Sequence, residues 1–194
     1  TMPFDAMTEV SNEALLVAYG NGDRAAAQAL TLRLTPRVFG YAARVLSDRT
    51  EAEDVVQEAM LRLWKIAPDW RPGEAQVSTW LYRVTVNLCT DRLRKSGRSV
   101  DIYAVAEPED GQPSAVAAMI DGDRAQALQA ALDTLPERQR QAVVLRHLEG
   151  LSNPEIAVVM DIGIEAVESL TARGKRALRA ALAGRREELG YDDD

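Results

Sequence analysis

The chain has 194 residues, of which 46% are hydrophobic, so it can build a core in one medium-sized domain or two small ones. Its one cysteine, Cys89, excludes a disulfide framework within the chain and is typical of a reducing cytoplasm. No stretch is long and apolar enough to span a bilayer, and the N-terminus lacks the basic and apolar segments of a secretory signal. We therefore predict a cytoplasmic protein without membrane insertion.

The distribution of charge is uneven. Alanine is abundant and aromatic residues make up only 5%, which favours helices over sheets. The net charge of −7 would argue against nucleic-acid binding if it were evenly spread. However, residues 169–186 carry six basic and no acidic side chains, whereas residues 97–122 and the tail 187–194 are acidic. Local blocks of charge are therefore the better guide to partners.

The first two predicted helices are bounded by capping residues and glycines. Ser11 and Asn12 are candidate caps for "SNEALLVAY", which ends at the glycine-rich turn 20–22. Asp23 can cap the helix that follows. The dipeptide Thr35–Pro36 predicts a break and a new helix with proline at its first position.

The third predicted helix, "EAEDVVQEAMLRLWKI", begins at a capping box formed by Thr50 and Glu53. Its outward positions include Asp54, Gln57, Glu58 and Arg62, and the apolar residues Leu61 and Trp64 are near them. Such a face can dock on a protein partner. On physical grounds alone, a solvated acidic first turn favoured by the helix dipole explains the acidic residues equally well.

A basic helix, "VSTWLYRVTVNLCTDRLRK", is predicted from about Val77, with Ser78 as its cap and its end near Gly97. One stripe is apolar and consists of Val77, Leu81, Val84 and Leu88, widened by Tyr82, Val86, Cys89 and Leu93. A second stripe consists of Trp80, Arg83, Asn87, Thr90 and Arg94. Aromatic stacking, amide hydrogen bonds and positive charge together suit single-stranded nucleic acid. The alternative is that Trp80 belongs to the core and that the other residues form a solvated face.

Residues 97–122 contain proline, glycine and acids without a helical period, so we predict an acidic linker there. A helical pattern resumes at Asp123, and another helix is predicted from about Pro136 to Glu149. Ser152 and Glu155 form a second capping box.

The sequence "DIG" then predicts a tight turn before a long amphipathic helix from Ile164, and the two helices around it match a helix-turn-helix. In the second helix, the predicted core positions are Ile164, Val167, Thr171 and Leu178. The outward positions are Glu165, Glu168, Ser169, Ala172, Arg173 and Arg176. DNA binding by this basic face is favoured over a helical hairpin with a solvated face.

No set of residues suggests catalysis. His147 is the only histidine, and neither it nor Cys89 has metal-ligand spacing to a second strong ligand. There is no glycine loop that would cradle a phosphate, and the carboxylate pairs are ordinary for helices. We predict no enzyme activity, no cofactor and no metal site, which leaves an all-α enzyme as a remote alternative.

Three segments together resemble the bacterial RNA polymerase sigma factors of the extracytoplasmic-function type. They are "LLVAYGNGDRAAAQALTLRLTPRVFGYAARVLSDRTEAEDVVQEAMLRLWK", "VSTWLYRVTVNLCTDRLRK" and "LPERQRQAVVLRHLEGLSNPEIAVVMDIGIEAVESLTARGKRAL", in the family's order. The resemblance covers residues 12–96 and 124–182 and rests most on "AEDVVQE" and "TWLYRVTVN". It implies two helical domains that bind core RNA polymerase and open promoter DNA.

The resemblance also implies roles for individual residues. The helix with Asp54, Gln57, Glu58, Leu61 and Trp64 would dock on the polymerase. The segment with Trp70, Trp80, Arg83, Asn87 and Arg94 would capture the −10 element as a single strand, and Asn87 would contact a base. The helix with Ser169, Arg173, Lys175 and Arg176 would bind the −35 element. An anti-sigma factor is the implied regulatory partner.

Three positions depart from the family's pattern. The family often has basic residues where this chain has Glu168 and Leu170, and a Ser or Thr cap where it has Gly163. A glutamate facing DNA repels phosphate, although it can accept a hydrogen bond from the amino group of cytosine. The resemblance therefore predicts a −35 element of unusual sequence, or a Glu168 side chain that is turned aside.

The prediction as a whole is an all-α fold of two small helical domains joined by a linker. Residues 1–96 would be the polymerase-docking and −10 domain, residues 97–122 the linker, and residues 123–194 the helix-turn-helix domain. The predicted function is that of a sigma factor. The main alternative is a stand-alone helix-turn-helix regulator in which residues 1–96 form a sensory or dimerisation domain.

Overall fold

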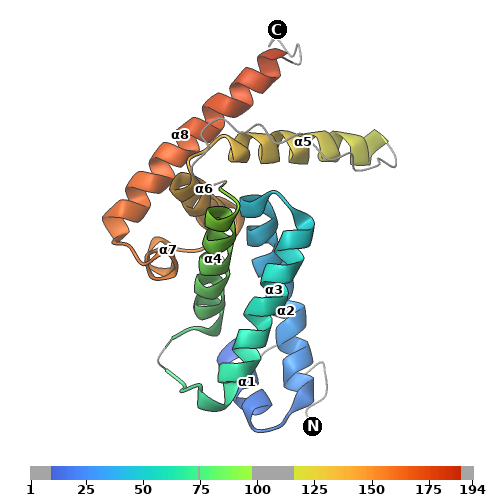
Figure 1. Cartoon of the computed structure of the whole chain (residues 1–194), viewed down its shortest axis with the longest axis vertical. Coiled ribbons are helices and arrows are strands. Elements are labelled where there is room, and N and C mark those ends of the chain that lie inside the picture. Colours follow the sequence, from blue (N-terminus) through green and yellow to red (C-terminus); the bar gives the residue numbers. More distant parts are fainter. Residues whose placement is uncertain (1–9, 74, 98–115, 189–194) are drawn as a thin grey trace.

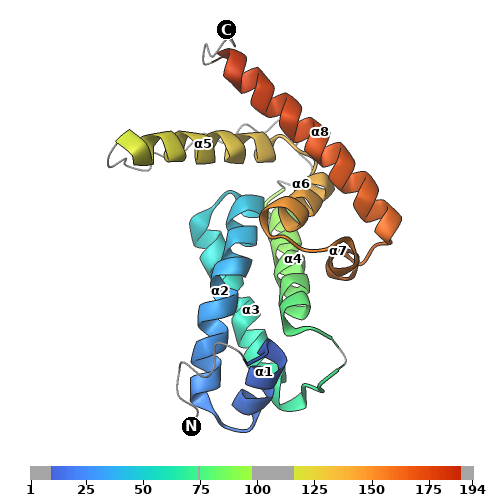
Figure 2. The same ribbon diagram turned by 180° about the vertical axis from the view of Figure 1, so that it is seen from behind.

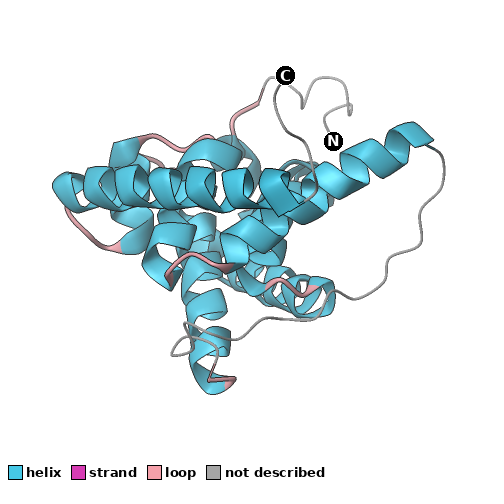
Figure 3. Ribbon diagram, turned by 90° about the horizontal axis from the view of Figure 1, so that it is seen from above, coloured by secondary structure: helices cyan, strands magenta, loops and turns pink. Residues whose placement is uncertain are grey.

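The computed structural model describes residues 10–73, 75–97 and 116–188, with the backbone alone for 116–121 and 186–188. Throughout these ranges the secondary structure consists of helices, turns and loops without a strand (Figure 3). The predicted all-α class is confirmed. No helix in the described ranges combines the length and the apolar character needed to cross a bilayer.

The first group of helices comprises α1 (Asn12–Gly20), α2 (Arg24–Leu46), α3 (Arg49–Ile66), the short 3-10 helix η2 (Ala67–Asp69) and α4 (Val77–Lys95). The four α-helices lie together in one half of the molecule (Figure 1). The helix α2 packs on α1, α3 and α4, and α3 also packs on α4. This group therefore has a buried face on each of its helices.

The helix starts confirm some predicted caps and correct others. The Ser11 and Asp23 side chains accept hydrogen bonds from backbone N–H groups of α1 and α2, as predicted. The start of α3 differs, because Asp48 rather than Thr50 is its cap and accepts from the backbone of Glu51 at 2.9 Å.

The start of α4 also differs from the prediction. The predicted cap Ser78 lies inside the helix, and the residue before the helix, Gln76, makes no side-chain capping bond. Instead, Oε1 of Glu13 on α1 accepts a hydrogen bond from the backbone N–H of Val77 at 2.8 Å. A carboxylate at a helix N-terminus satisfies a free donor and complements the helix dipole. The cap of α4 is therefore tertiary and invisible in local sequence.

The predicted break at Thr35–Pro36 is wrong, because α2 runs without interruption through Pro36. A proline inside a helix leaves the carbonyl four residues earlier, that of Leu32, without its backbone donor. Leu32 is 57% exposed and Pro36 is also exposed, so this carbonyl lies on the side of α2 that faces water. On the opposite side, Leu34 and Val38 are buried and hold the helix against the core.

The second group comprises α5 (Val116–Asp133), α6 (Glu137–Val143), η3 (Val144–Leu148), α7 (Asn153–Met160) and α8 (Ile164–Glu188). The helix α5 begins at Val116, inside the segment predicted as a linker; the rest of that segment from Arg98 lies outside the described residues. The far ends of α5 and α8 project from the body of the molecule (Figures 1 and 2).

The helix predicted from Pro136 to Glu149 is not a uniform α-helix. Residues 144–148 form a π-helix, η3, which ends with the Glu149 N–H donating to the carbonyl of Val144 at 2.9 Å. The predicted capping box before α7 is confirmed, because the side chains of Ser152 and Glu155 each accept from the other residue's backbone. Asp161 adopts the left-handed conformation in the predicted turn.

The two groups of helices share one hydrophobic core. It extends from Leu15 and Leu16 in α1 to Val167 in α8. The helix α4 packs on α7, and α2 packs on α5, α6 and η3. Gln129 and Arg140 donate hydrogen bonds to the carbonyls of Arg44 and Val45 at the end of α2. The two groups of helices are therefore held together as one packed body.

Candidate functional site

The first candidate surface, the α3 surface, is formed by the five predicted residues Asp54, Gln57, Glu58, Leu61 and Trp64. Leu61 is 62% exposed, and Asp54 and Gln57 are also exposed. Residues at this spacing lie along one face of the helix. Ionic contacts here are modest, because Asp54 lies 4.0 Å from Arg92 and the Glu58–Arg62 pair, at 2.8 Å, lies largely in water.

Trp64 has a more structural position than the sequence predicts. Its ring is half-buried and lies 4.8 Å from the ring of Tyr19 on α1, tilted by 60°. Aromatic pairs at this distance stabilise packing. Trp64 therefore offers a partner only part of its surface, whereas Leu61 beside it presents most of its side chain to solvent.

The second candidate surface, the α4 surface, consists of Trp70, Trp80, Arg83, Asn87 and Arg94. The structure brings the two tryptophans together edge to face, with 6.4 Å between ring centroids and 86° between ring planes. Both are half-buried and pack against the core. The indole Nε1 of Trp70 is buried without a hydrogen-bond partner in the structure. Trp80 therefore fits both alternatives, because its ring packs against the core on one side and is partly exposed on the other.

The polar members of the α4 surface point to solvent. Arg83, Asn87 and Arg94 are exposed, and Arg94 lies 3.8 Å from Asp91 in a pair open to water. The remaining residue of the predicted stripe, Thr90, instead accepts a hydrogen bond from Nε2 of Gln141 on α6 at 3.2 Å. The part of this face near Thr90 is thus covered by the second group of helices.

The third candidate surface, the α8 surface, consists of Ser169, Arg173, Lys175 and Arg176, and all four residues are exposed. No carboxylate lies within ion-pairing distance of these cations among the described residues. Val167 is fully buried as predicted and anchors the start of the helix. The predicted core position Ile164 is wrong, because its side chain is 47% exposed. Ile164 is the first residue of α8, where the chain leaves the turn and no neighbouring helix covers it.

One polar contact between the two groups was not predicted from the sequence. Tyr82 on α4 is 2% exposed, and its hydroxyl donates a hydrogen bond to the carboxylate of Glu149 at 2.8 Å. The guanidinium of Arg37 lies over the Tyr82 ring, 5.5 Å from its centroid. Burial raises the pKa of Glu149, although the bond from Tyr82 opposes this shift. The available signal was Tyr82 itself, because a tyrosine on an apolar stripe needs a partner for its hydroxyl.

The thiol of Cys89 is buried, which lowers its reactivity. Cys89 is fully buried on α4, and burial raises its pKa to about 12, so its reactive thiolate form is scarce at neutral pH. Within the described ranges, no group of three or more His, Cys, Asp or Glu residues could hold a metal ion. The exposed groups of the three surfaces are suited to binding.

Two family models match the chain in separate segments. The model described as Sigma-70 region 2 matches residues 30–99, and the model described as Sigma-70, region 4 matches residues 125–178. The first segment contains most of α2 with α3 and α4, and the second contains α6, α7 and the first half of α8. Each of the three surfaces therefore lies in a segment that one of these models matches.

Curated relatives match over most of the chain. The ECF RNA polymerase sigma factor SigM of Mycobacterium tuberculosis is 36% identical over 185 residues, which cover 92% of this chain and 88% of that protein. The RNA polymerase sigma-H factor of Pseudomonas aeruginosa is 31% identical, with 91% and 96% covered. The ECF RNA polymerase sigma factor SigE of Mycolicibacterium smegmatis is 36% identical, and the match covers 84% of this chain but only 65% of that protein.

Solved structures support the fold. CnrH, in complex with the cytosolic domain of CnrY, has a TM-score of 0.67 at 23% identity, with 89% of this chain and 97% of that chain covered. The sigma factor RpoE of Bartonella quintana, in complex with the anti-sigma factor NepR, has a TM-score of 0.62 at 24% identity, with 79% and 94% covered. At these identities the likeness shows a shared helical fold.

Proposed function

The chain belongs to the ECF sigma factors of RNA polymerase, and from this membership we propose that it binds core RNA polymerase and directs it to promoters. The observation that carries the proposal is the presence of both sigma regions, in order, in one chain that matches such factors at 31–36% identity. The chain acts in the cytoplasm, where the polymerase and its promoters are. Synthesis of RNA itself is the work of the polymerase.

We assign one task to each exposed surface. The α3 surface docks on the polymerase, with Leu61 as its apolar centre and the acidic residues around it. The α4 surface captures the −10 element after the strands part, because it joins aromatic edges to the Asn87 amide and the arginines. The α8 surface binds the −35 element as duplex in the major groove. This division is supported by the exposure of the polar groups on each surface.

The same surfaces suit a regulatory partner. CnrH and RpoE, which share this fold, were each solved with a bound protein, and the partner of RpoE is an anti-sigma factor. We propose that this chain is likewise held inactive by an anti-sigma factor. Such a partner would be the first protein to look for in a complex purified from cells.

Run-off transcription tests the proposed function directly. We expect the purified chain to make core RNA polymerase start at a defined promoter, because a sigma factor supplies promoter recognition that core lacks. A stand-alone helix-turn-helix regulator would need another sigma factor in the same reaction. Transcripts that appear only when a second sigma factor is added would therefore contradict the proposal.

Asn87→Ala should separate strand capture from duplex binding. Loss of one base contact costs about 1–3 kcal/mol, so we expect promoter opening, followed by permanganate reactivity of the −10 bases, to fall about tenfold. Binding of the same protein to a −35 duplex should be unchanged. The matched variant Arg173→Ala should lower the affinity of the protein for the −35 duplex. It should have a smaller effect on the opening of promoters that are already bound. Equal losses of both activities in Asn87→Ala would contradict its role.

A further inference from the structure

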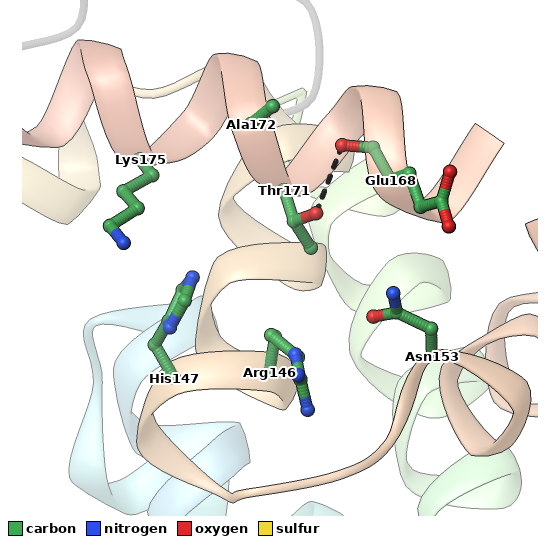
Figure 4. A pocket seen from close by; sticks show the side chains of 7 residues that line it. All are labelled: Arg146, His147, Asn153, Glu168, Thr171, Ala172 and Lys175. Atoms are coloured by element: carbon green, nitrogen blue, oxygen red, sulfur yellow. Dashed lines mark hydrogen bonds between the residues drawn. The ribbon is translucent and has the colours of Figure 1, made fainter. Parts of the chain in front are cut away.

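A hollow lies between η3, α7 and α8, on the flank of the α8 surface. Its volume is about 230 Å³, and it is lined by Arg146, His147, Asn153, Glu168, Thr171, Ala172 and Lys175 (Figure 4). Lys175 and His147 lie at one end, Glu168 and Asn153 at the other, and Arg146 between them. Of these residues, only Lys175 belongs to a surface already assigned a role. We call this hollow the η3–α8 pocket.

The pocket carries two cationic side chains and one carboxylate, Glu168, and neither cation forms an ion pair with a described residue. Arg146 and Lys175 line it, and the described residues place no Asp or Glu oxygen within ion-pairing distance of either. Arg146 is held in place because its guanidinium donates to the carbonyl of Leu151 at 3.0 Å. Glu168 belongs to the opposite end, away from Lys175 (Figure 4). The pocket therefore has one end suited to an anion.

The π-helical turn explains why Arg146 and His147 reach this place. A π-helix has a wider turn than an α-helix and is often found at functional sites. Here Val144 and Leu145 are fully buried, while the next two residues, Arg146 and His147, are exposed toward α8. The turn thus presents two adjacent nitrogen-rich side chains from the element that precedes the helix-turn-helix.

His147 is sensitive to what occupies the pocket. Partial burial lowers its pKa below the ordinary value, and the positive charges of Lys175, Arg146 and Arg179 lower it further. Arg146 belongs to the same turn as His147, and Lys175 and Arg179 belong to α8. The helices α2, α6 and α7 also pack on this turn, but none of their charged groups contributes to the pKa shift of His147. An anion among these groups would reverse the effect and favour the charged imidazolium.

We propose that the η3–α8 pocket binds a phosphate of the DNA backbone beside the bases contacted by α8, and that His147 takes up a proton when it does so. The inference rests on the proposed function and extends it to Arg146 and His147. A helix in the major groove has backbone phosphates on both flanks, and the first helix of a helix-turn-helix, here α7, crosses that backbone. The pocket lies beside both helices, because Asn153 at the start of α7 and Lys175 of α8 line it together with Arg146 and His147 of η3.

The sign of the pH dependence follows from this proton uptake. The pKa of His147 is low in the free protein and higher in the DNA complex, so binding takes up a proton between the two values. Affinity is therefore highest below the pKa of the free protein and falls as the pH rises through the window up to the pKa of the complex. Above that window, the histidine contributes only as a neutral donor.

Proton NMR of the imidazole tests the proposal without residue assignment, because His147 is the only histidine in the sequence. The tag-free full chain is titrated from about pH 5 to pH 8, alone and with a duplex of about 20 base pairs, two helical turns. We expect DNA to raise the pKa of His147 by about one unit, equivalent to about tenfold tighter binding at the low-pH plateau. Inorganic phosphate, added at the concentration of phosphate groups in the DNA sample, should leave the pKa of His147 unchanged.

Two comparisons separate the pocket from the general field of DNA. In a chain with His147→Gln and Gln28→His, the single histidine is on the exposed face of α2, and its pKa should shift much less. Lys175→Gln should reduce the DNA-induced shift of His147, whereas Arg24→Gln, at an exposed cation of the first group, should leave it unchanged. Equal shifts at positions 147 and 28, no shift with DNA, or an equal shift with inorganic phosphate would each overturn the proposal.

Run-off transcription distinguishes failure of this site from failure of the proposed function. If transcripts appear and His147 does not respond to DNA, the pocket proposal is wrong and the sigma function stands. If His147 responds to DNA as expected and the chain never supports initiation by core polymerase, the sigma function is wrong and the pocket remains a DNA site.

Discussion

Leu61→Asp should weaken binding of the chain to core RNA polymerase about 30-fold, which corresponds to about 2 kcal/mol. Leu61 is 62% exposed on α3, next to Asp54, Gln57 and Glu58. A large apolar side chain at the centre of an acidic face is typical of a contact that loses its water when a partner binds. Aspartate removes the apolar contact and adds a charge that must be desolvated.

Leu32→Asp is the matched control for this experiment. Leu32 is 57% exposed on α2, so the same change is made at a leucine of nearly the same exposure in the same group of helices. We expect its affinity for core, measured by competition with a labelled sigma factor, to stay within about twofold, a change of less than about 0.5 kcal/mol. Equal losses in the two variants, with unchanged circular dichroism, would rule out a special role for Leu61.

Gly174→Val should destabilise the chain by about 3 kcal/mol and impair DNA binding by the α8 surface. Gly174 is buried within α8, where that helix crosses α6. A Cβ atom at this position would collide with the side chain of Val143 and lie 3.0 Å from the backbone oxygen of Gln139. Valine would therefore push α8 away from α6 and move Arg173, Lys175 and Arg176 relative to the rest of the helix-turn-helix.

The control for this change lies on the same helix. Gly184 has open space where its Cβ would be, so Gly184→Ala should stabilise α8 by up to about 1 kcal/mol through helix propensity alone. Urea unfolding measures both free energies, and a short DNA duplex measures binding. Stabilisation by Gly174→Ala to the same extent as by Gly184→Ala would show that the crossing of α6 and α8 tolerates a side chain.

The sequence predicts the helices well where their signals are local. Asp23 and the Ser152–Glu155 box cap their helices as expected, because each cap bonds within three residues of itself. The start of α4 escapes prediction because its cap, Glu13, is 64 residues away from Val77. Pro36 misleads for a related reason, since packing of α2 by Leu34 and Val38 outweighs the lost backbone bond.

Helical spacing predicts which residues lie on the candidate surfaces, but it does not predict the contacts between elements that shape these surfaces. Spacing correctly separates the buried Val77 and Leu81 from the exposed Arg83 and Asn87. It cannot show that Trp70 and Trp80 meet edge to face, because Trp70 precedes α4 and helical spacing does not apply to it. The pocket beside α8 was equally hidden, since it depends on the width of the π-helical turn at residues 144–148.

The packing of α4 against α7 sets a limit on reach. Positions −10 and −35 of a promoter are about 25 base pairs apart, which is about 85 Å of duplex at ~3.4 Å per base pair. The helices α4, α7 and α8 pack in succession, and packed helices lie about 8–10 Å from axis to axis. A helix of 25 residues such as α8 is only about 37 Å long. Both lengths are far below the distance between the two promoter elements. For Asn87 and Ser169 to contact both elements of one promoter, α4 must leave α7 and the bond between Tyr82 and Glu149 must break. The packed protein is thus shorter than the distance between the two promoter elements. The hydrophobic core that the two groups of helices share stabilises the packed form and opposes the separation that binding to both elements requires.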